Sequence, residues 1–290
     1  MKKLKSLLLL FLCGIFFFLC ALGSTSTSNE NYKRDAQENT NTKIIEVSFA
    51  EEKVYEGNNV VIYVTGSESS YDGTKINFRI ENNSQLNLNF NAHSYGVNGI
   101  MTGNNIYDMR TDVPAGKKAN NSLTIENSFL NEYGIDCIKY LEILFWAYDN
   151  DKMFKSFDTG AVIVKSDKYD NINSWIKGTE IYNAEGIRVD FLSFKNDKAK
   201  YLVTNTKGNS IDVTFEGICI NDYSVNDTDY DLYNEQILNN NQRVFEISIS
   251  NDFKSKNSIQ DVKTIDFYLS YEIGSDYTSH KTSAMKTTIG

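Results

Sequence analysis

Residues 265–273 have the sequence I-D-F-Y-L-S-Y-E-I. Five apolar side chains, from Ile265 to Ile273, stand at alternate positions with more polar residues between them. A β-strand places all five on one face, whereas a helix would scatter them around its circumference. Burying each of these side chains is worth roughly 1.5–3 kcal/mol, so this strand alone could anchor a sheet.

A related stretch lies 124 residues earlier, at 141–148, and belongs to a weak internal repeat. The offset between matched residues begins at 127, drifts through 126 and 125, and settles at 124. The matched pairs include Val60 with Ile187, Asn83 with Asn209, Phe90 with Phe215, His93 with Ile218, and Val113 with Ile237. Small deletions in loops produce such a drift. The repeat predicts one unit over residues 44–166 and another over residues 171–290.

Each unit contains six or seven short alternating stretches separated by turn residues, and no long amphipathic helix competes with them. One helical turn is expected around Phe129–Ile138. The segment V-P-A-G, residues 113–116, predicts a type I turn. In the second unit Asn240 replaces Gly116, and asparagine is the next residue to tolerate positive φ. These features predict an all-β protein of two tandem immunoglobulin-like antiparallel β-sandwich domains, without the Cys…Trp…Cys framework of antibody domains.

The first 23 residues predict a signal segment. Three lysines precede an almost wholly apolar run, and small residues stand at its end up to Gly23. Three outcomes remain open: cleavage before Ser24 and release, lipid attachment at Cys20, or retention as an uncleaved membrane anchor. Leu19 stands where a lipoprotein motif takes a small residue. Residues 24–43 contain no Val, Ile, Leu or Phe, and they predict a flexible, disordered tether.

The charge balance narrows the class of partner. The chain has a formal net charge of −9 and an isoelectric point near 4.9. Binding to nucleic acid or to anionic membranes needs clustered Lys and Arg, so neither is expected. We expect an exported monomer, secreted or attached to the outer face of the cell membrane. It would contact the membrane only through its N-terminal signal or a lipid anchor.

Three blocks of the first unit are similar to a known module: I-E-N-N-S (80–84), V-P-A-G-K-K-A-N (113–120) and G-I-D-C-I-K-Y-L-E-I (134–143). They resemble a tandem β-sandwich module, without an assigned activity, of exported proteins and lipoproteins of low-GC Gram-positive bacteria. The resemblance covers residues 54–166 well and 180–290 poorly, because the second unit lacks the Pro-Ala-Gly turn and both lysines of the first. It implies a fold and a location, and it supplies no catalytic residues.

Catalytic motifs are absent from the sequence. The two histidines, His93 and His280, lie in different units, and no C-x-x-C pair exists. No G-x-S-x-G, H-E-x-x-H or P-loop motif occurs. We therefore expect no catalytic activity and no cofactor. Cys137 and Cys219 stand at non-equivalent places in the two units, and we expect buried free thiols.

A weak calcium candidate lies in the second unit. Asp227, Asp229 and Asp231 have the spacing that opens an EF-hand loop, but Leu232 stands at its glycine position. The EF-hand pattern therefore fails. Two interpretations remain: a looser oxygen cage that also uses Asp222 or Glu235, and a solvated acidic loop without metal.

The clearest difference between the two units is that one strand of the first carries aromatic and apolar side chains on the face where the second is more polar. The stretch 141–148 has a core face like that of 265–273, but its opposite face carries Leu144, Trp146 and Tyr148. Two interpretations remain open. The strand is central and covered, by a loop or by the region around Trp175, or the three residues form an exposed strip that binds a sugar, a peptide or another protein.

The function favoured by these observations is an exported cell-surface or secreted binding or adhesion module whose ligand is an extracellular glycan, peptide or protein. Candidate binding residues are Leu144, Trp146 and Tyr148. The alternative is a structural spacer, a pair of domains that holds another part of a protein away from the cell envelope.

Overall fold

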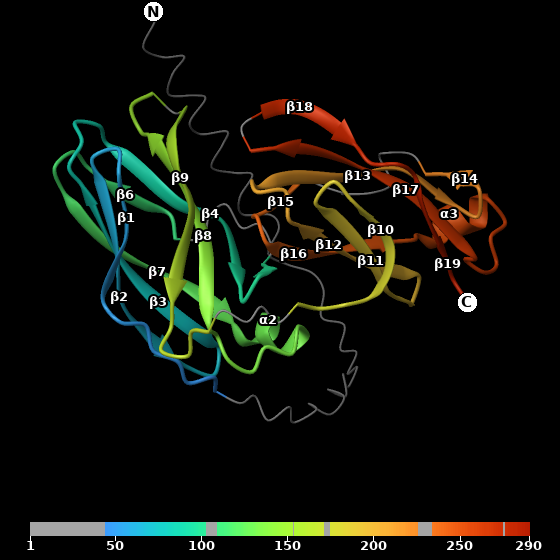
Figure 1. Cartoon of the computed structure of the whole chain (residues 1–290), viewed down its shortest axis with the longest axis horizontal. Coiled ribbons are helices and arrows are strands. Elements are labelled where there is room, and N and C mark those ends of the chain that lie inside the picture. Colours follow the sequence, from blue (N-terminus) through green and yellow to red (C-terminus); the bar gives the residue numbers. More distant parts are fainter. Residues whose placement is uncertain (1–43, 103–108, 153, 171–174, 226–233, 275) are drawn as a thin grey trace, which may run out of the picture. The chain divides into compact units, whose positions relative to one another are not determined.

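The computed structural model describes residues 44–290 except 103–108, 153, 171–174, 226–233 and 275 (Figure 1). All described residues belong to one compact unit of the chain. The predicted signal segment with Cys20 and the predicted tether lie outside the described residues, as does the calcium candidate Asp227, Asp229 and Asp231. Within the described ranges, no helix is sufficiently long and apolar to cross a membrane.

The described chain is all-β, as predicted. In its first half, residues 44–166, four strands form an antiparallel sheet in the order β1-β2-β3-β7. These are β1 (Glu52–Gly57), β2 (Val60–Ser69), β3 (Gly73–Asn82) and β7 (Lys118–Glu126). The other strands are β4 (Leu88–Val97), β5 (Ile100–Met101), β6 (Thr111–Val113), β8 (Tyr140–Asp149) and β9 (Phe154–Lys165). Among these five strands, β4 pairs with β5, β6 and β8, and β8 pairs with β9.

The second half, residues 175–290, repeats this arrangement (Figure 1). One group of paired strands runs β10 (Thr179–Ala184), β11 (Ile187–Lys195), β12 (Lys198–Asn205) and β16 (Asn241–Ser248). The other consists of β13 (Ile211–Ile220), β14 (Tyr223–Ser224), β15 (Glu235–Ile237), β17 (Thr264–Ile273), β18 (Asp276–Lys281) and β19 (Met285–Thr288). A short helix precedes the late strand in each half, α2 (Asn127–Glu132) and α3 (Asn251–Lys256).

Two hydrophobic clusters form the core, one for each half. The predicted inward face of β8 is confirmed, because Leu141, Ile143, Phe145 and Ala147 are all fully buried in the first cluster. On β17 the residues from Ile265 to Tyr271 at alternate positions are buried in the second cluster, and Ile273 at the strand end is partly buried. Alternation therefore predicted which face of each late strand is buried.

Buried asparagines show the repeat at atomic detail. Asn82 is fully buried and donates from Nδ2 to the carbonyls of Leu86 and Val113, both at 2.8 Å. Asn205, equally buried, donates to the carbonyls of Asn209 and Ile237 at 2.8 and 3.0 Å. In each case Oδ1 accepts from the backbone N–H two residues later. The same side chain therefore ties the same loop to the same strand in both halves.

These bonds correct part of the sequence alignment. Asn82 matches Asn205 at an offset of 123, and Leu88 and Ile211 face the equivalent residues Val113 and Ile237. The pairings of Phe90 with Phe215 and His93 with Ile218, at offset 125, are therefore wrong by two residues. A slip of two along a strand leaves every side chain on its predicted face, so the hydrophobic pattern cannot detect it. The match of Asn83 with Asn209, at offset 126, is wrong by three residues in the adjoining loop.

The predicted turn is shifted by one residue. The backbone N–H of Lys117 donates to the carbonyl of Pro114, so the turn spans residues 114–117 and not 113–116. Its third residue is Gly116, which has φ +67°. A positive φ at that position is typical of a type II turn rather than the type I turn expected. Its counterpart Asn240 has φ +58°, as the replacement of glycine by asparagine predicted.

The helical turn was predicted around Phe129–Ile138, and it lies slightly earlier. α2 ends at Glu132, and Gly134 follows with φ +63°. The backbone N–H of Ile135 donates to the carbonyl of Leu130 at 2.7 Å, which closes the helix end. A residue in the left-handed region at this position stops further helical hydrogen bonding.

Candidate functional site

One sheet continues from the first half into the second. Its strand order is β10-β11-β12-β16-β5-β4-β8-β9, and β16 lies parallel to β5. The pairing is short: Gln242 lies opposite Ile100, and its backbone N–H donates to the carbonyl of Gly99 at 2.7 Å. We call this place the junction, and side chains from both halves reinforce it.

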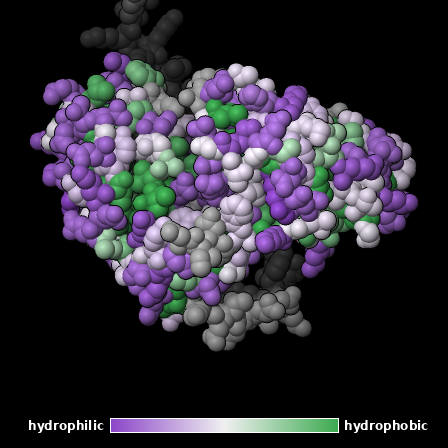
Figure 2. Space-filling view, in the orientation of Figure 1, coloured by the Kyte–Doolittle hydropathy of each residue, from purple (hydrophilic) through white to green (hydrophobic). Residues whose placement is uncertain are grey.

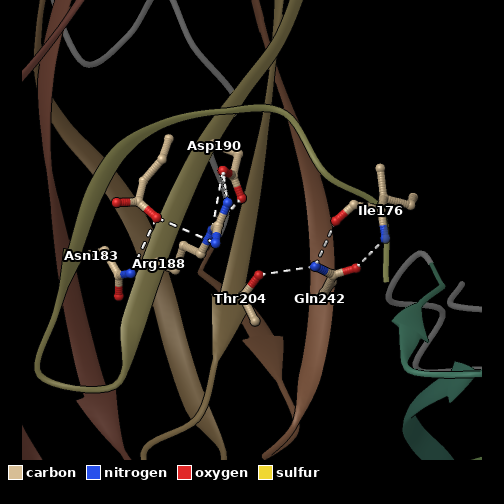
Figure 3. Close-up of polar contacts among 7 residues, drawn as sticks. Ile176, Asn183, Arg188, Asp190, Thr204 and Gln242 are labelled. Carbon is tan, nitrogen blue, oxygen red and sulfur yellow. Dashed lines mark hydrogen bonds and ion pairs between the residues drawn. The ribbon is translucent and has the colours of Figure 1, made fainter. Parts of the chain in front are cut away.

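The amide of Gln242 is one reinforcement (Figure 3). Its Nε2 donates to the carbonyl of Ile176 and to Oγ1 of Thr204, each at 3.1 Å. Its Oε1 accepts from the backbone N–H of Ile176 at 2.9 Å. Gln242 is almost fully buried, so these bonds satisfy a side chain that would otherwise be costly to bury. They fix the segment before β10 against the edge of β16.

A buried ion pair is the second reinforcement. Arg243 pairs with Glu235 of β15, and its Nη1 donates to the carbonyl of Thr102 at 2.9 Å. Thr102 follows β5 in the first half, so the guanidinium bonds across the junction. Burial raises the pKa of Glu235 and lowers the pKa of Arg243, although each partner favours the charged form of the other. Both charged groups have therefore lost solvation, and each is stabilised by the opposite charge of the other.

The carboxylate of Glu142 also takes part in the junction. Nδ2 of Asn241 donates to Oε2 of Glu142 on β8 at 2.6 Å. Burial raises the pKa of Glu142 above its usual 4.5, and the bond from Asn241 only partly offsets this. The charged form of Glu142 is therefore disfavoured in the folded chain relative to the unfolded chain.

We predict that Glu142→Gln stabilises the chain at neutral pH relative to acid pH. The pKa of Glu142 is higher in the folded chain than in the unfolded chain. This difference stabilises the wild type below the unfolded pKa, and the stabilisation is lost as pH rises through the folded pKa. The glutamine side chain keeps an acceptor for Asn241 and has no charge to bury. The melting temperature of E142Q minus that of the wild type should therefore rise from pH 4 to pH 7.

Glu81→Gln is the matched control for this prediction. Lys118 and Arg79 bond Glu81 and lower the pKa of its carboxyl, so its contribution to stability has the opposite sign. The melting temperature of E81Q minus wild type should fall from pH 4 to pH 7. Equal trends for the two variants would contradict the assignment of Glu142 as a buried, destabilised carboxylate.

The predicted binding residues lie on the outer face of β8. Leu144 is buried and packs in the hydrophobic cluster of the second half. The ring of Trp146 stacks on that of His93 with centroids 3.3 Å apart and planes at 11°. Tyr148 lies next to Trp146, with ring centroids 6.0 Å apart, and burial raises the pKa of Tyr148. The strand is central, with β4 on one side and β9 on the other.

A pocket of about 370 Å³ opens beside two of these residues, Leu144 and Trp146. Its remaining walls come from β9 and from the strands and turns of the second half. Its polar lining includes Asp158 from the first half and Asp212, Gln236 and Asn239 from the second. The pocket volume lies at the lower end of the roughly 300–1,000 Å³ range of small-molecule sites.

Glycines surround the pocket. Gly160, Gly208 and Gly274 line it, and all three have positive φ, from +57° to +92°. A Cβ placed on any of them would meet nothing within 4 Å, so the space beside their backbone is open. Backbone N–H and C=O groups are most accessible at such residues because no side chain covers them.

Gln236 has an unused acceptor. Its side chain is buried, with 7% exposure, and its Oε1 has no hydrogen-bond partner within the described structure. A buried acceptor without a partner is uncommon in a folded protein and calls for an explanation. Gln236 is among the residues that line the pocket, but this oxygen is itself shielded from solvent.

Asp158, Asp212 and Gln236 were not among the residues predicted from sequence. They lie on three strands, β9, β13 and β15, far apart in the chain. Nothing in their local sequence distinguishes them from other polar residues on strands. The pairing of β5 with β16 and the side-chain contacts around it bring the first half to the other two, and no periodicity predicts that contact.

Other candidate chemistry is limited. Glu235, a candidate for a looser calcium cage, is engaged by Arg243. In the described part of the chain, no three His, Cys, Asp or Glu residues are grouped closely enough to hold a metal ion. Cys137 and Cys219 are unbonded, as predicted, but both are half-buried and not buried. Burial raises the pKa of Cys137, so its thiol is less reactive than usual.

The face shown in Figure 2 carries hydrophobic residues as separate patches among hydrophilic ones. No protein-family model matches the chain, and no curated protein matches its sequence.

Proposed function

We propose that the chain is an exported binding or adhesion module, secreted or attached to the outer face of the cell membrane. The apolar segment after three lysines at the N-terminus supports export. The negative net charge supports a partner other than nucleic acid or an anionic membrane. The ligand we propose is an extracellular glycan, peptide or protein, and we propose no catalytic role.

We further propose that its architecture is two tandem immunoglobulin-like β-sandwich domains, 44–166 and 171–290. Three observations support this. Each half has its own hydrophobic cluster between antiparallel strands. The halves repeat the bonds of Asn82 and Asn205 and the pairing of β4 with β6 and β13 with β15. The strands of each half pair in two groups, and two packed antiparallel sheets are usual for immunoglobulin-like domains.

The observation that carries the binding function is the pocket beside Leu144 and Trp146, which residues of both halves line and which we call the junction pocket. It combines an aromatic side chain, Trp146, with polar side chains that include Asp158, Asp212 and Asn239. Apolar side chains combined with a few convergent polar groups are a common feature of ligand sites, although the lining here is about as polar as it is apolar. Because both halves line it, ligand binding would also depend on the junction.

A binding array tests this function. The full exported chain is applied to immobilised glycans and peptides, and the hits are repeated with Trp146→Ala. We expect at least one class of hit, with binding reduced about tenfold or more in the variant, because aromatic anchors dominate binding energy. Tyr223→Ala is the control, since Tyr223 is 47% exposed and lies on β14, outside the pocket.

The spacer is the second candidate, and the rigid junction favours it. Gln242 and Arg243 hold the halves together by buried bonds, as a spacer of fixed length would require. The same variant separates the two functions. Trp146→Ala that lowers the melting temperature and leaves every array hit unchanged would favour the spacer and contradict a ligand site at the pocket.

A further inference from the structure

The side chain of Asn241 crosses the junction and lies against the outer face of β8. Its Nδ2 donates to Oε2 of Glu142 at 2.6 Å and to the carbonyl of Asn239 at 2.9 Å. Because both partners are acceptors, they identify this end of the amide as the nitrogen. Asn241 is fully buried, so solvent does not reach its amide.

Gly96 makes room for this amide. It lies on β4 directly opposite Glu142 on β8, and residues opposite one another point to the same face of a sheet. A Cβ added to Gly96 would lie 2.7 Å from Oδ1 of Asn241, which is closer than real Cβ contacts. The amide of Asn241 therefore packs onto the backbone of Gly96, beside the carboxyl of Glu142.

Oδ1 of Asn241 lacks a donor. This oxygen is enclosed and has no hydrogen-bond partner within the described structure, which is costly for a buried acceptor. Of the two partners of Nδ2, Asn239 offers a carbonyl, which cannot donate. A carboxyl gains one O–H donor when it is protonated. Glu142 is therefore the bonded partner that can also satisfy Oδ1.

We propose that Glu142 and Asn241 form a proton-dependent latch that holds the two halves together more tightly at acid pH. When the carboxyl of Glu142 takes up a proton from the solvent, one of its oxygens still accepts from Nδ2, and its new O–H donates to Oδ1. Two hydrogen bonds across the junction then replace one, and the buried charge is gone.

Few titratable groups of β8 and β9 face Glu142. On β8 the neighbour on the same face is Tyr140, which stays neutral between pH 4 and pH 7 because burial, and then the charge of Glu142, raises its pKa to about 12. On β9 the residue opposite Glu142 is Ile163, and Lys165 lies opposite Tyr140. The ammonium of Lys165 lies over the ring of Tyr169, 4.6 Å from its centroid.

β4 and β16 place uncharged residues, Gly96 and Asn241, against Glu142. Burial raises the pKa of the Glu142 carboxyl, and the bond from Asn241 offsets this in part. The latch therefore adds stability below the unfolded pKa of Glu142 and loses it as pH rises through the folded pKa. Burial also raises the pKa of Glu235 at the junction, but that carboxyl is bonded to Arg243.

Hydrogen exchange of the Gln242 amide tests the latch. Gln242 follows Asn241, and its N–H donates across the junction to the carbonyl of Gly99. Its protection factor is measured in the full chain at pH 4 and pH 7, for the wild type and for Glu142→Gln. The glutamine keeps an acceptor for Nδ2 and has a permanent N–H donor for Oδ1, so it reproduces the protonated carboxyl.

We expect equal protection of the two chains at pH 4. At pH 7 the amide should be about three- to tenfold better protected in Glu142→Gln, which is the effect of one added hydrogen bond. Glu235 is unchanged in both chains, so its titration cancels in the comparison. Glu46→Gln is the control, because Glu46 is exposed and lies outside the junction, and it should match the wild type at both pH values.

The second hydrogen bond has a readout of its own. One N–H of the side-chain amide introduced by Glu142→Gln should exchange slowly in an NMR experiment, because it donates to the enclosed Oδ1 of Asn241.

Two results would overturn the latch. A ratio of protection between Glu142→Gln and the wild type that is the same at pH 4 and pH 7 would show that Glu142 links no proton to the junction. An introduced amide whose N–H groups both exchange freely would refute donation to Oδ1, even with the pH dependence intact, and would leave the buried charge as its cause.

Discussion

Replacing Arg243 with alanine is expected to destabilise the chain by about 3–5 kcal/mol, because it leaves the partly buried carboxylate of Glu235 without its counter-charge. Arg243 is 6% exposed, so water cannot easily replace the guanidinium. The carbonyl of Thr102 in the first half also loses a donor. The free energy of unfolding from guanidinium titration measures the loss.

Two further variants test the cause and the size of this loss of stability. Adding Glu235→Gln to Arg243→Ala should recover part of the loss, since the uncompensated charge is then gone. Lys200→Ala breaks an ion pair with Glu132 between the same two halves, at 3.2 Å, but the two side chains are 38% and 52% exposed. Its effect should stay below about 1 kcal/mol. An Arg243→Ala variant as stable as Lys200→Ala would contradict the buried pair.

Asn82→Ala and Asn205→Ala are expected to destabilise the chain by similar amounts, about 3–5 kcal/mol each. Each change leaves one buried carbonyl, one partly buried carbonyl and one backbone N–H without their partner on this side chain. An unsatisfied buried group costs about 1–3 kcal/mol. Thermal and chemical unfolding of the two single variants measures both values.

Asn83→Ala is the control for this pair. Asn83 is exposed, so its side chain should contribute less than about 0.5 kcal/mol. A large loss in Asn82→Ala with almost none in Asn205→Ala would show that the two halves use their buried asparagines differently. That result would contradict the repeated scaffold.

The sequence allowed the buried faces to be predicted because burial imposes a period of two on strands. Alternation identified the inward faces of β8 and β17, and both are buried. The same property hides a slip of two residues, which is why Phe90 was matched with Phe215 although β4 and β13 align at offset 123. The turn after Val113 was predicted one residue early, because proline fits both the first and the second position of such a turn.

The candidate site could be predicted only in part. Leu144 and Trp146 stood out because the outer face of β8 is more apolar than that of β17, and both line the pocket. Asp158, Asp212 and Gln236 did not stand out, since polar residues on strands are common and their convergence depends on the junction. That junction rests on Gln242 and Arg243, whose counterparts in the first half at offset 124 are Lys118 and Ala119. The repeat therefore does not predict the junction.

The hydrogen exchange rate of the backbone amide of Gln242 in the full chain directly tests whether the two halves pair at the junction. This N–H donates to the carbonyl of Gly99, so it reports the pairing of β16 with β5 from which the pocket is built. Protection comparable to that of the amides inside β12 and β13 is the predicted result. Exchange at the rate of an unpaired amide, with β12 and β13 still protected, would show that the halves do not pair and would contradict the site.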